Sequence, residues 1–109
     1  MAIYCIYGAS GHSKVIIEIL EGSGSSVREL FDDDQNKTRL LDFNVTRNKE
    51  ILKLPGVNWI IGVGNNRIRK KIADHNRLDY ANAIDVSAKI SKRIKIGKGT
   101  VIMPGVCIN

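Results

Sequence analysis

A glycine-rich segment near the start of the chain has the residue types of an anion-binding loop. It reads Gly8-Ala9-Ser10-Gly11-His12-Ser13-Lys14 and lies between an apolar run and a segment with helical spacing. Glycines at such a place let the backbone approach a ligand, and the free N–H groups at a helix start favour phosphate. The spacing is GxxGH rather than the GxGxxG of dinucleotide-binding proteins, which disfavours an NAD site. A tight turn without a ligand is the alternative interpretation.

Of the two histidines, His12 has the more suggestive position because it lies in this glycine turn. The positive end of a helix disfavours protonation of an imidazole, so we expect a neutral His12 that contributes to binding. His75 has polar neighbours in the sequence and is expected to face solvent. Neither histidine belongs to a group with metal-ligand spacing, and we expect no metal site.

Two further polar segments follow apolar runs. Asp32-Asp33-Asp34 ends the second apolar run, and Gly64-Asn65-Asn66 ends the third. The carboxyl ends of parallel strands meet at one edge of a sheet, so these segments should lie beside the glycine turn. A carboxylate there could accept a hydrogen bond from a ribose hydroxyl or from the imide N–H of a uracil ring. An acidic turn and an asparagine helix cap are the structural alternatives.

The elements that must position these segments alternate between strand and helix. Apolar runs predict strands over 2–7, 27–31, 57–63 and 80–84. Helical spacing predicts one helix from Ser13 to a stop near Gly22 and another after Asn66, and Thr46 could cap a short helix in the least regular segment, 35–55. This order indicates an α/β fold, with a small Rossmann-like parallel sheet and flanking helices, as a first domain over residues 1–83.

The apolar period changes after residue 83. Isoleucines recur every six residues at Ile84, Ile90, Ile96, Ile102 and Ile108. Hexapeptide repeats of this kind build β-helices, whose coils stack their apolar positions on one another. We therefore predict a second domain over residues 84–109 that holds the first coil of a β-helix. One coil cannot bury its stacking face, so the chain is expected to be the front piece of a longer protein.

Composition limits the function classes that remain. Apolar residues make up 43% of the chain and charged residues 26%, as in ordinary globular proteins. No apolar run is long enough to span a bilayer and no secretion leader is recognisable, so we expect a cytoplasmic protein without a membrane span. The net charge is +6, and much of it lies after residue 83. That basic segment lacks interleaved aromatic residues, so solvated lysines are favoured over nucleic-acid binding.

The ordered set of motifs resembles a known enzyme family. IYGASGHSKV, LFDDD, GNNRIRKKI and the isoleucine hexads follow one another as in the bacterial hexapeptide-repeat sugar-nucleotide acetyltransferases. The likeness covers essentially the whole chain. It is greatest to the UDP-4-amino-sugar N-acetyltransferases of bacillosamine biosynthesis, and sialic acid O-acetyltransferase relatives share the same layout.

The resemblance implies a Rossmann-like domain that holds a UDP-sugar, followed by a left-handed β-helix, with acetyl-CoA as cosubstrate and a homotrimeric full-length protein. Carried over by position, Ser10, Gly11 and His12 match the substrate-binding loop, Asp32 and Asp33 the uracil-contacting acids, and Gly64 a further substrate contact. The catalytic base of the family is a histidine in a later coil, and neither histidine here corresponds to it. The resemblance therefore implies that the catalytic residue lies beyond Asn109, and that this chain alone is inactive and binds no acetyl-CoA.

Two other functions remain open from the sequence. One is a non-catalytic nucleotide-binding or regulatory module, which fits a chain without the family's base. The other is an O-acetyltransferase of the sialic acid type. A redox domain using NAD is disfavoured by GASGH and by a chain too short for a separate substrate domain.

Overall fold

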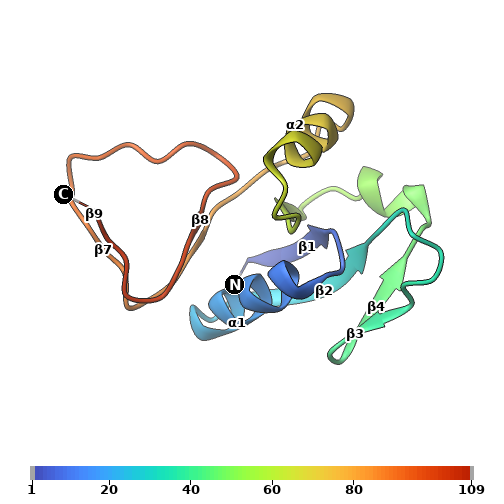
Figure 1. The fold of residues 1–109 in the computed structure, drawn as a ribbon, viewed down its shortest axis with the longest axis horizontal. Helices are drawn as coiled ribbons and strands as arrows, with labels where there is room; N and C mark the ends of the chain where they lie inside the picture. The colour runs from blue at the N-terminus through green and yellow to red at the C-terminus, as the bar shows by residue number, and fades with distance from the viewer. Residues whose placement is uncertain (1, 109) are drawn as a thin grey trace.

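The computed structural model describes residues 2–108 and contains an α/β sheet of five strands (Figure 1). The order across the sheet is β3-β4-β2-β1-β5. The strands are β1 (Ile3–Tyr7), β2 (Ser26–Phe31), β3 (Arg39–Leu40), β4 (Phe43–Thr46) and β5 (Asn58–Ile61). β1 pairs in parallel with β2 and with β5, and β2 pairs in parallel with β4. The expected α/β fold with a mainly parallel sheet is confirmed.

Alternating side chains of β1 pack on both faces of the sheet. Tyr4 and Ile6 lie in the core cluster shared with helix α1 (Gly11–Gly22), which also supplies Ile16 and Leu20. Cys5 and Tyr7 lie in a second cluster, whose centre is Trp59 of β5. A strand buried on both faces is apolar throughout, which is why this run is recognisable without a polar alternation.

The segment between β2 and β5 contains the expected short helix, but Thr46 does not cap it. Thr46 instead ends β4, which forms an antiparallel hairpin with β3. A 3-10 helix, η1 (Lys49–Lys53), follows, and its cap is Asn48, whose Oδ1 accepts the Glu50 N–H at 3.1 Å. The hairpin was missed because a two-residue strand is too short to establish an alternating pattern.

The second helix, α2 (Asn66–His75), lies on the surface with no buried residue. Asn65 caps it, since its Oδ1 accepts the Ile68 N–H at 3.0 Å. The helix ends at His75, and Ile68 on its surface is 47% exposed. The helix is therefore held at its start by the cap and along its length by few apolar contacts.

The C-terminal segment returns to lie beside itself after one circuit, which Figure 1 shows as an open triangular path next to the sheet. β6 (Ala83–Ile84) pairs in parallel with β8 (Val101–Ile102), and β7 (Lys89–Ile90) pairs with β9 (Cys107–Ile108). Paired residues are eighteen positions apart, because Ile84 faces Ile102 and Ile90 faces Ile108. This spacing equals three of the six-residue repeats found in the sequence.

The expected strand over 80–84 is divided between these two parts of the molecule. Tyr80 forms an isolated parallel bridge with Trp59 of the main sheet, whereas Ala83 pairs with Val101 of the C-terminal circuit. Ala83 is 1% exposed and packs in the cluster that α1 shares with β1. The Tyr4 hydroxyl donates to the Asn82 carbonyl at 3.4 Å. Residues 80–84 are mainly apolar because they pack over the core, and they do not form one continuous strand of the main sheet.

Candidate functional site

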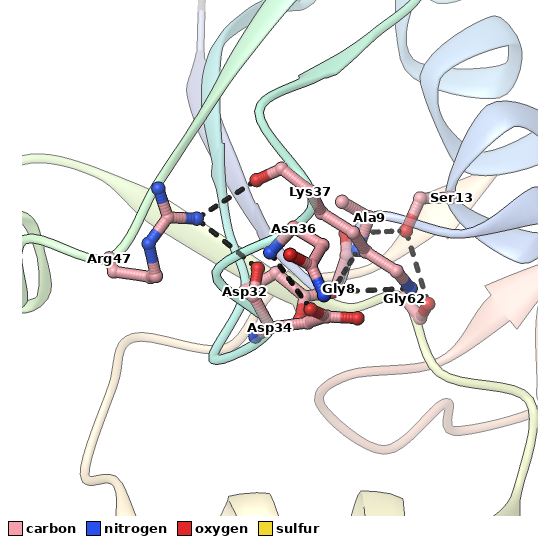
Figure 2. Close-up of polar contacts among 9 residues, drawn as sticks. All are labelled: Gly8, Ala9, Ser13, Asp32, Asp34, Asn36, Lys37, Arg47 and Gly62. Atoms are coloured by element: carbon pink, nitrogen blue, oxygen red, sulfur yellow. Dashed lines mark hydrogen bonds and ion pairs between the residues drawn. The ribbon is translucent and has the colours of Figure 1, made fainter.

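The turn between β1 and α1 is held by a buried serine. The Ser13 side chain is fully buried. Its hydroxyl is shared between two carbonyl acceptors, that of Gly8 at 2.8 Å and that of Gly62 at 3.1 Å (Figure 2). Two carbonyls at the ends of neighbouring strands thus share one hydroxyl. A buried hydroxyl with its hydrogen bond satisfied rigidifies the turn. Ser13 fixes the glycine turn against the end of β5.

Glycine is required at both of these positions by close approach. Gly8 has a φ of +119°, and a Cβ there would lie 2.8 Å from the Gly62 carbonyl oxygen. A Cβ on Gly62 would overlap the Ser13 hydroxyl and lie 2.8 Å from Cγ2 of Ile6. These glycines serve packing between strand ends. They need no ligand to explain them.

Asp32 ties the acidic segment to the glycine turn. Its Oδ2 accepts the Ala9 N–H at 2.8 Å, and its Oδ1 accepts the Asp34 N–H at 2.9 Å (Figure 2). The Lys37 ammonium lies 3.8 Å from Oδ2 of the same carboxylate. Both oxygens of Asp32 are therefore engaged within the protein, so this residue positions the two loops relative to each other.

Asp33 is oriented by the last residue of β1. The Tyr7 hydroxyl donates to Oδ2 of Asp33 at 2.9 Å. Burial of the phenol, together with the hydrogen bond to Asp33, raises the pKa of Tyr7 well above its usual range. The phenol therefore stays protonated and keeps donating. Asp33 is itself exposed, and its other oxygen, Oδ1, has no partner among the described residues.

The remaining candidates lie at the same edge of the sheet with open space above them. Ser10 and His12 are half-buried, whereas Gly11 and Gly64 are exposed. A Cβ added at Gly11 or Gly64 would meet no atom within 4 Å. Within residues 2–108, the imidazole of His12 has no hydrogen bond or ion pair. The structure thus leaves this loop accessible from solvent.

Four residues that help to build this edge were not singled out from the sequence. They are Ser13, Tyr7, Lys37 and Arg47, and the Arg47 guanidinium donates to the carbonyls of Asp34 at 3.2 Å and Lys37 at 2.9 Å. Tyr7 carried a usable signal, because a tyrosine that ends a buried strand places its hydroxyl at the sheet edge. Lys37 and Arg47 carried none, since their contacts depend on the unforeseen hairpin.

Other kinds of site find no support in the part of the chain that the structure describes. Over residues 2–108 no three histidine, cysteine or acidic side chains gather to hold a metal ion. None of the described helices is long and apolar enough to cross a membrane. His75 is exposed, as expected, and its Nδ1 lies 2.7 Å from the Lys71 carbonyl oxygen.

Comparison with known proteins identifies the family to which this arrangement belongs. The family model described as the PglD N-terminal domain matches residues 4–75. The chain belongs to this family. It is also 36% identical over 107 residues to UDP-N-acetylbacillosamine N-acetyltransferase of Bacillus subtilis. This match covers 90% of this chain and 50% of the B. subtilis protein. The expected resemblance to the sugar-nucleotide acetyltransferases is confirmed.

Solved structures of PglD-related acetyltransferases have the same fold. PerB from Caulobacter crescentus, in complex with CoA and GDP-perosamine, matches with a TM-score of 0.85 and 31% identity, over 100% of this chain and 55% of that chain. The acetyltransferase domain of PglB from Neisseria gonorrhoeae, in complex with acetyl coenzyme A, matches with a TM-score of 0.78 and 26% identity, over 98% of this chain and 58% of that chain. The chain thus spans about half the length of these relatives.

Proposed function

We propose that these 109 residues are the sugar-nucleotide-binding portion of an acetyl-CoA-dependent sugar N-acetyltransferase. The observation that carries the proposal is the tie between the two candidate loops, made by the Ala9 N–H and the Asp32 carboxylate at 2.8 Å. It brings the glycine turn and the acidic segment to one sheet edge. The relatives supply the ligand class, since one is named for a UDP-linked sugar and another holds GDP-perosamine.

The division of labour between the acids supports base recognition by Asp33. Both oxygens of Asp32 accept backbone N–H groups, whereas Oδ1 of the exposed Asp33 has no partner among the described residues. A carboxylate oxygen accepts a ring N–H, which both uracil and guanine present and which cytosine and adenine lack. One acid at this place thus suits both bases named in the relatives. We assign UDP-sugar as the preferred ligand because the B. subtilis relative acts on UDP-N-acetylbacillosamine by name.

Open backbone at Ser10, Gly11, His12 and Gly64 supports contact with the rest of the nucleotide. Packing does not require glycine at Gly11 or Gly64, because a Cβ there would meet nothing. The backbone N–H groups at the start of α1 favour an anion. These residues therefore suit a ligand that approaches the main chain closely.

In the proposed full-length protein, the C-terminal circuit is the first coil of a left-handed β-helix. The parallel pairing of residues eighteen positions apart supports this interpretation, because three hexads then make one turn. We propose the domain boundary at residues 83 and 84, acetyl-CoA as cosubstrate, and a homotrimeric cytoplasmic enzyme, as the family resemblance implies. The base that deprotonates the sugar amine is assigned to a later coil, and we expect no transfer by residues 1–109 alone.

A calorimetric screen tests the proposed ligand. UDP-sugar, UDP, GDP-sugar, CMP-sialic acid and NAD are titrated into the chain, and a UDP-sugar should bind most tightly while NAD gives no heat. Preference for CMP-sialic acid would favour a sialic-acid-type O-acetyltransferase. Binding of none of the nucleotides would refute the proposal.

A further inference from the structure

A cleft on the far side of α2 from Asp33 is lined by cations from two separate segments. It has a volume of about 240 Å³. Arg69 and Lys70 line it from α2, and Lys98 lines it from the C-terminal circuit. The cleft floor is Ile61, at the carboxyl end of β5, and no acidic side chain is among its lining residues in the described chain. The cleft is therefore a concentration of positive charge beside the carboxyl end of β5.

These cations lack partners within the described residues. The two ion pairs found there use Lys37 and Lys53, and neither involves a cation of the cleft. Among the described residues, the Arg69 guanidinium donates only to the Asn66 side chain, at 3.5 Å, and Asn66 also lines the cleft. Three like charges around one hollow repel one another, so the free protein gains nothing electrostatically from this arrangement.

The sequence of α2 makes the arrangement still less favourable without a ligand. Its first six residues include Arg67, Arg69, Lys70 and Lys71, and its first turn holds no acid. Cations near the amino end of a helix oppose its dipole. A bound anion would relieve both the repulsion and the opposition to the dipole.

The opposite wall of the cleft is shaped by a glycine turn. Gly99 has a φ of +83°, and a Cβ there would lie 3.9 Å from Cβ of Tyr80. The Tyr80 hydroxyl donates to the Asn76 carbonyl at 2.9 Å, which holds the ring against α2. The turn thus carries Lys98 to the cleft beside a fixed aromatic wall.

We propose that this cleft is a second anion site, which binds a phosphate group through Arg69, Lys70 and Lys98. Clustered cations match phosphate oxygens, and charge-assisted hydrogen bonds are the strong ones. The phosphate belongs either to the diphosphate of a sugar nucleotide or to CoA, and the two sources share this chemistry. The site is separate from the Asp33 edge, and its assignment to a sugar nucleotide or to CoA rests on the proposed function.

The test uses inorganic pyrophosphate as the probe. NMR follows the amide signals of Lys70 and Gly99, which distinguish binding at the cleft from binding at the Asp33 edge. Arg69→Met and Lys98→Met should each weaken pyrophosphate binding at these amides about five- to tenfold at low salt, and less at about 0.5 M salt. Arg67→Met and Lys92→Met are the matched controls, because each removes one cation from the same segment outside the cleft. These controls should change binding less than twofold, roughly the effect of a screened surface charge.

Parallel titrations with UDP and with CoA identify the source of the phosphate. Loss of affinity for UDP alone in the cleft variants assigns the site to the nucleotide, and loss for CoA alone assigns it to the cosubstrate. Equal loss in the cleft variants and the controls would overturn the proposal, as would the absence of pyrophosphate-dependent shifts at Lys70 and Gly99. Failure of the proposed function appears separately, as absent UDP-sugar binding in a protein that still binds pyrophosphate here.

Discussion

The two neighbouring acids at the end of β2 have different tasks despite their identical chemistry. Asp32 accepts two backbone N–H groups, whereas among the described residues the exposed Asp33 carboxylate accepts only the Tyr7 hydroxyl. We therefore expect Asp32 to serve mainly the packing of the two loops and Asp33 to be the acid that contacts a ligand. No sequence pattern distinguishes them, because the distinction depends on which carboxylate faces Ala9.

Asp33→Ala should lower UDP-sugar affinity, and it should also lower the free energy of unfolding by about 1 kcal/mol because the Tyr7 hydroxyl loses its acceptor. Losing a hydrogen bond to a charged acceptor should weaken binding by about 1.5–3 kcal/mol. Asp32→Ala should lower the free energy of unfolding by more than Asp33→Ala does, because two backbone N–H groups lose their acceptor. Calorimetry and urea denaturation measure the two quantities, with exposed Asp42→Ala as the control. Unchanged affinity in Asp33→Ala would remove this residue from the site.

Tyr7 predicts a specific dependence of stability on alkaline pH. Its pKa in the folded protein is raised above the ordinary value of 10.0, first by burial and then by Asp33. A raised folded pKa leaves stability intact below about pH 10, and stability falls as the pH rises further, because only the unfolded chain then loses its proton readily. Tyr7→Phe should therefore flatten the fall in stability above about pH 10 in denaturant titrations.

The pH prediction needs a comparison, because burial also raises the pKa of Tyr80. Tyr80→Phe should remove part of the alkaline loss too, but Tyr80 has no carboxylate partner among the described residues, so its effect should be smaller. An alkaline slope that is the same in Tyr7→Phe and in the unmodified chain would contradict the assigned hydrogen bond.

At the scale of elements, the contact between the β1–α1 turn and the end of β5 holds the site in place. Gly62→Ala should lower the free energy of unfolding by about 1–3 kcal/mol, because the new methyl overlaps Ser13 in a filled space. Gly22→Ala is the matched control, since a Cβ there meets no atom within 4 Å. Thermal denaturation of both variants measures the difference. Equal stability of the two variants would show that the strand ends are not tightly packed.

Much of the element arrangement followed from the sequence, and the exceptions have physical causes. The runs that became β1, β2 and β5 were recognisable because both faces of each strand lie near the core. The β3–β4 hairpin was not, because its pairing involves only two residues on each strand. The meeting of the glycine turn with Asp32 followed from parallel topology alone. The Tyr7 contact did not, because it depends on side-chain direction.

At the scale of the whole molecule, the proposal separates binding from catalysis. The chain should release no thiol from acetyl-CoA above background when a UDP-4-amino sugar is supplied. His75 is exposed on α2, and His12 lacks a carboxylate partner within residues 2–108, so neither is arranged as a general base. Removing a general base typically lowers the rate about a hundred- to ten-thousandfold. Robust turnover that His12→Ala abolishes would instead make His12 the base.

The most direct test of the central claim is a map of amide chemical shifts during titration of the isotope-labelled chain with a UDP-sugar. We predict saturable shifts at Ser10–His12, at Asp33 and at Gly64, which form one contiguous edge at the ends of β1, β2 and β5. The Asp33→Ala variant should show the same map with weaker affinity. Shifts confined to another surface, or an unchanged spectrum at saturating ligand, would contradict the assignment of this edge as the sugar-nucleotide site.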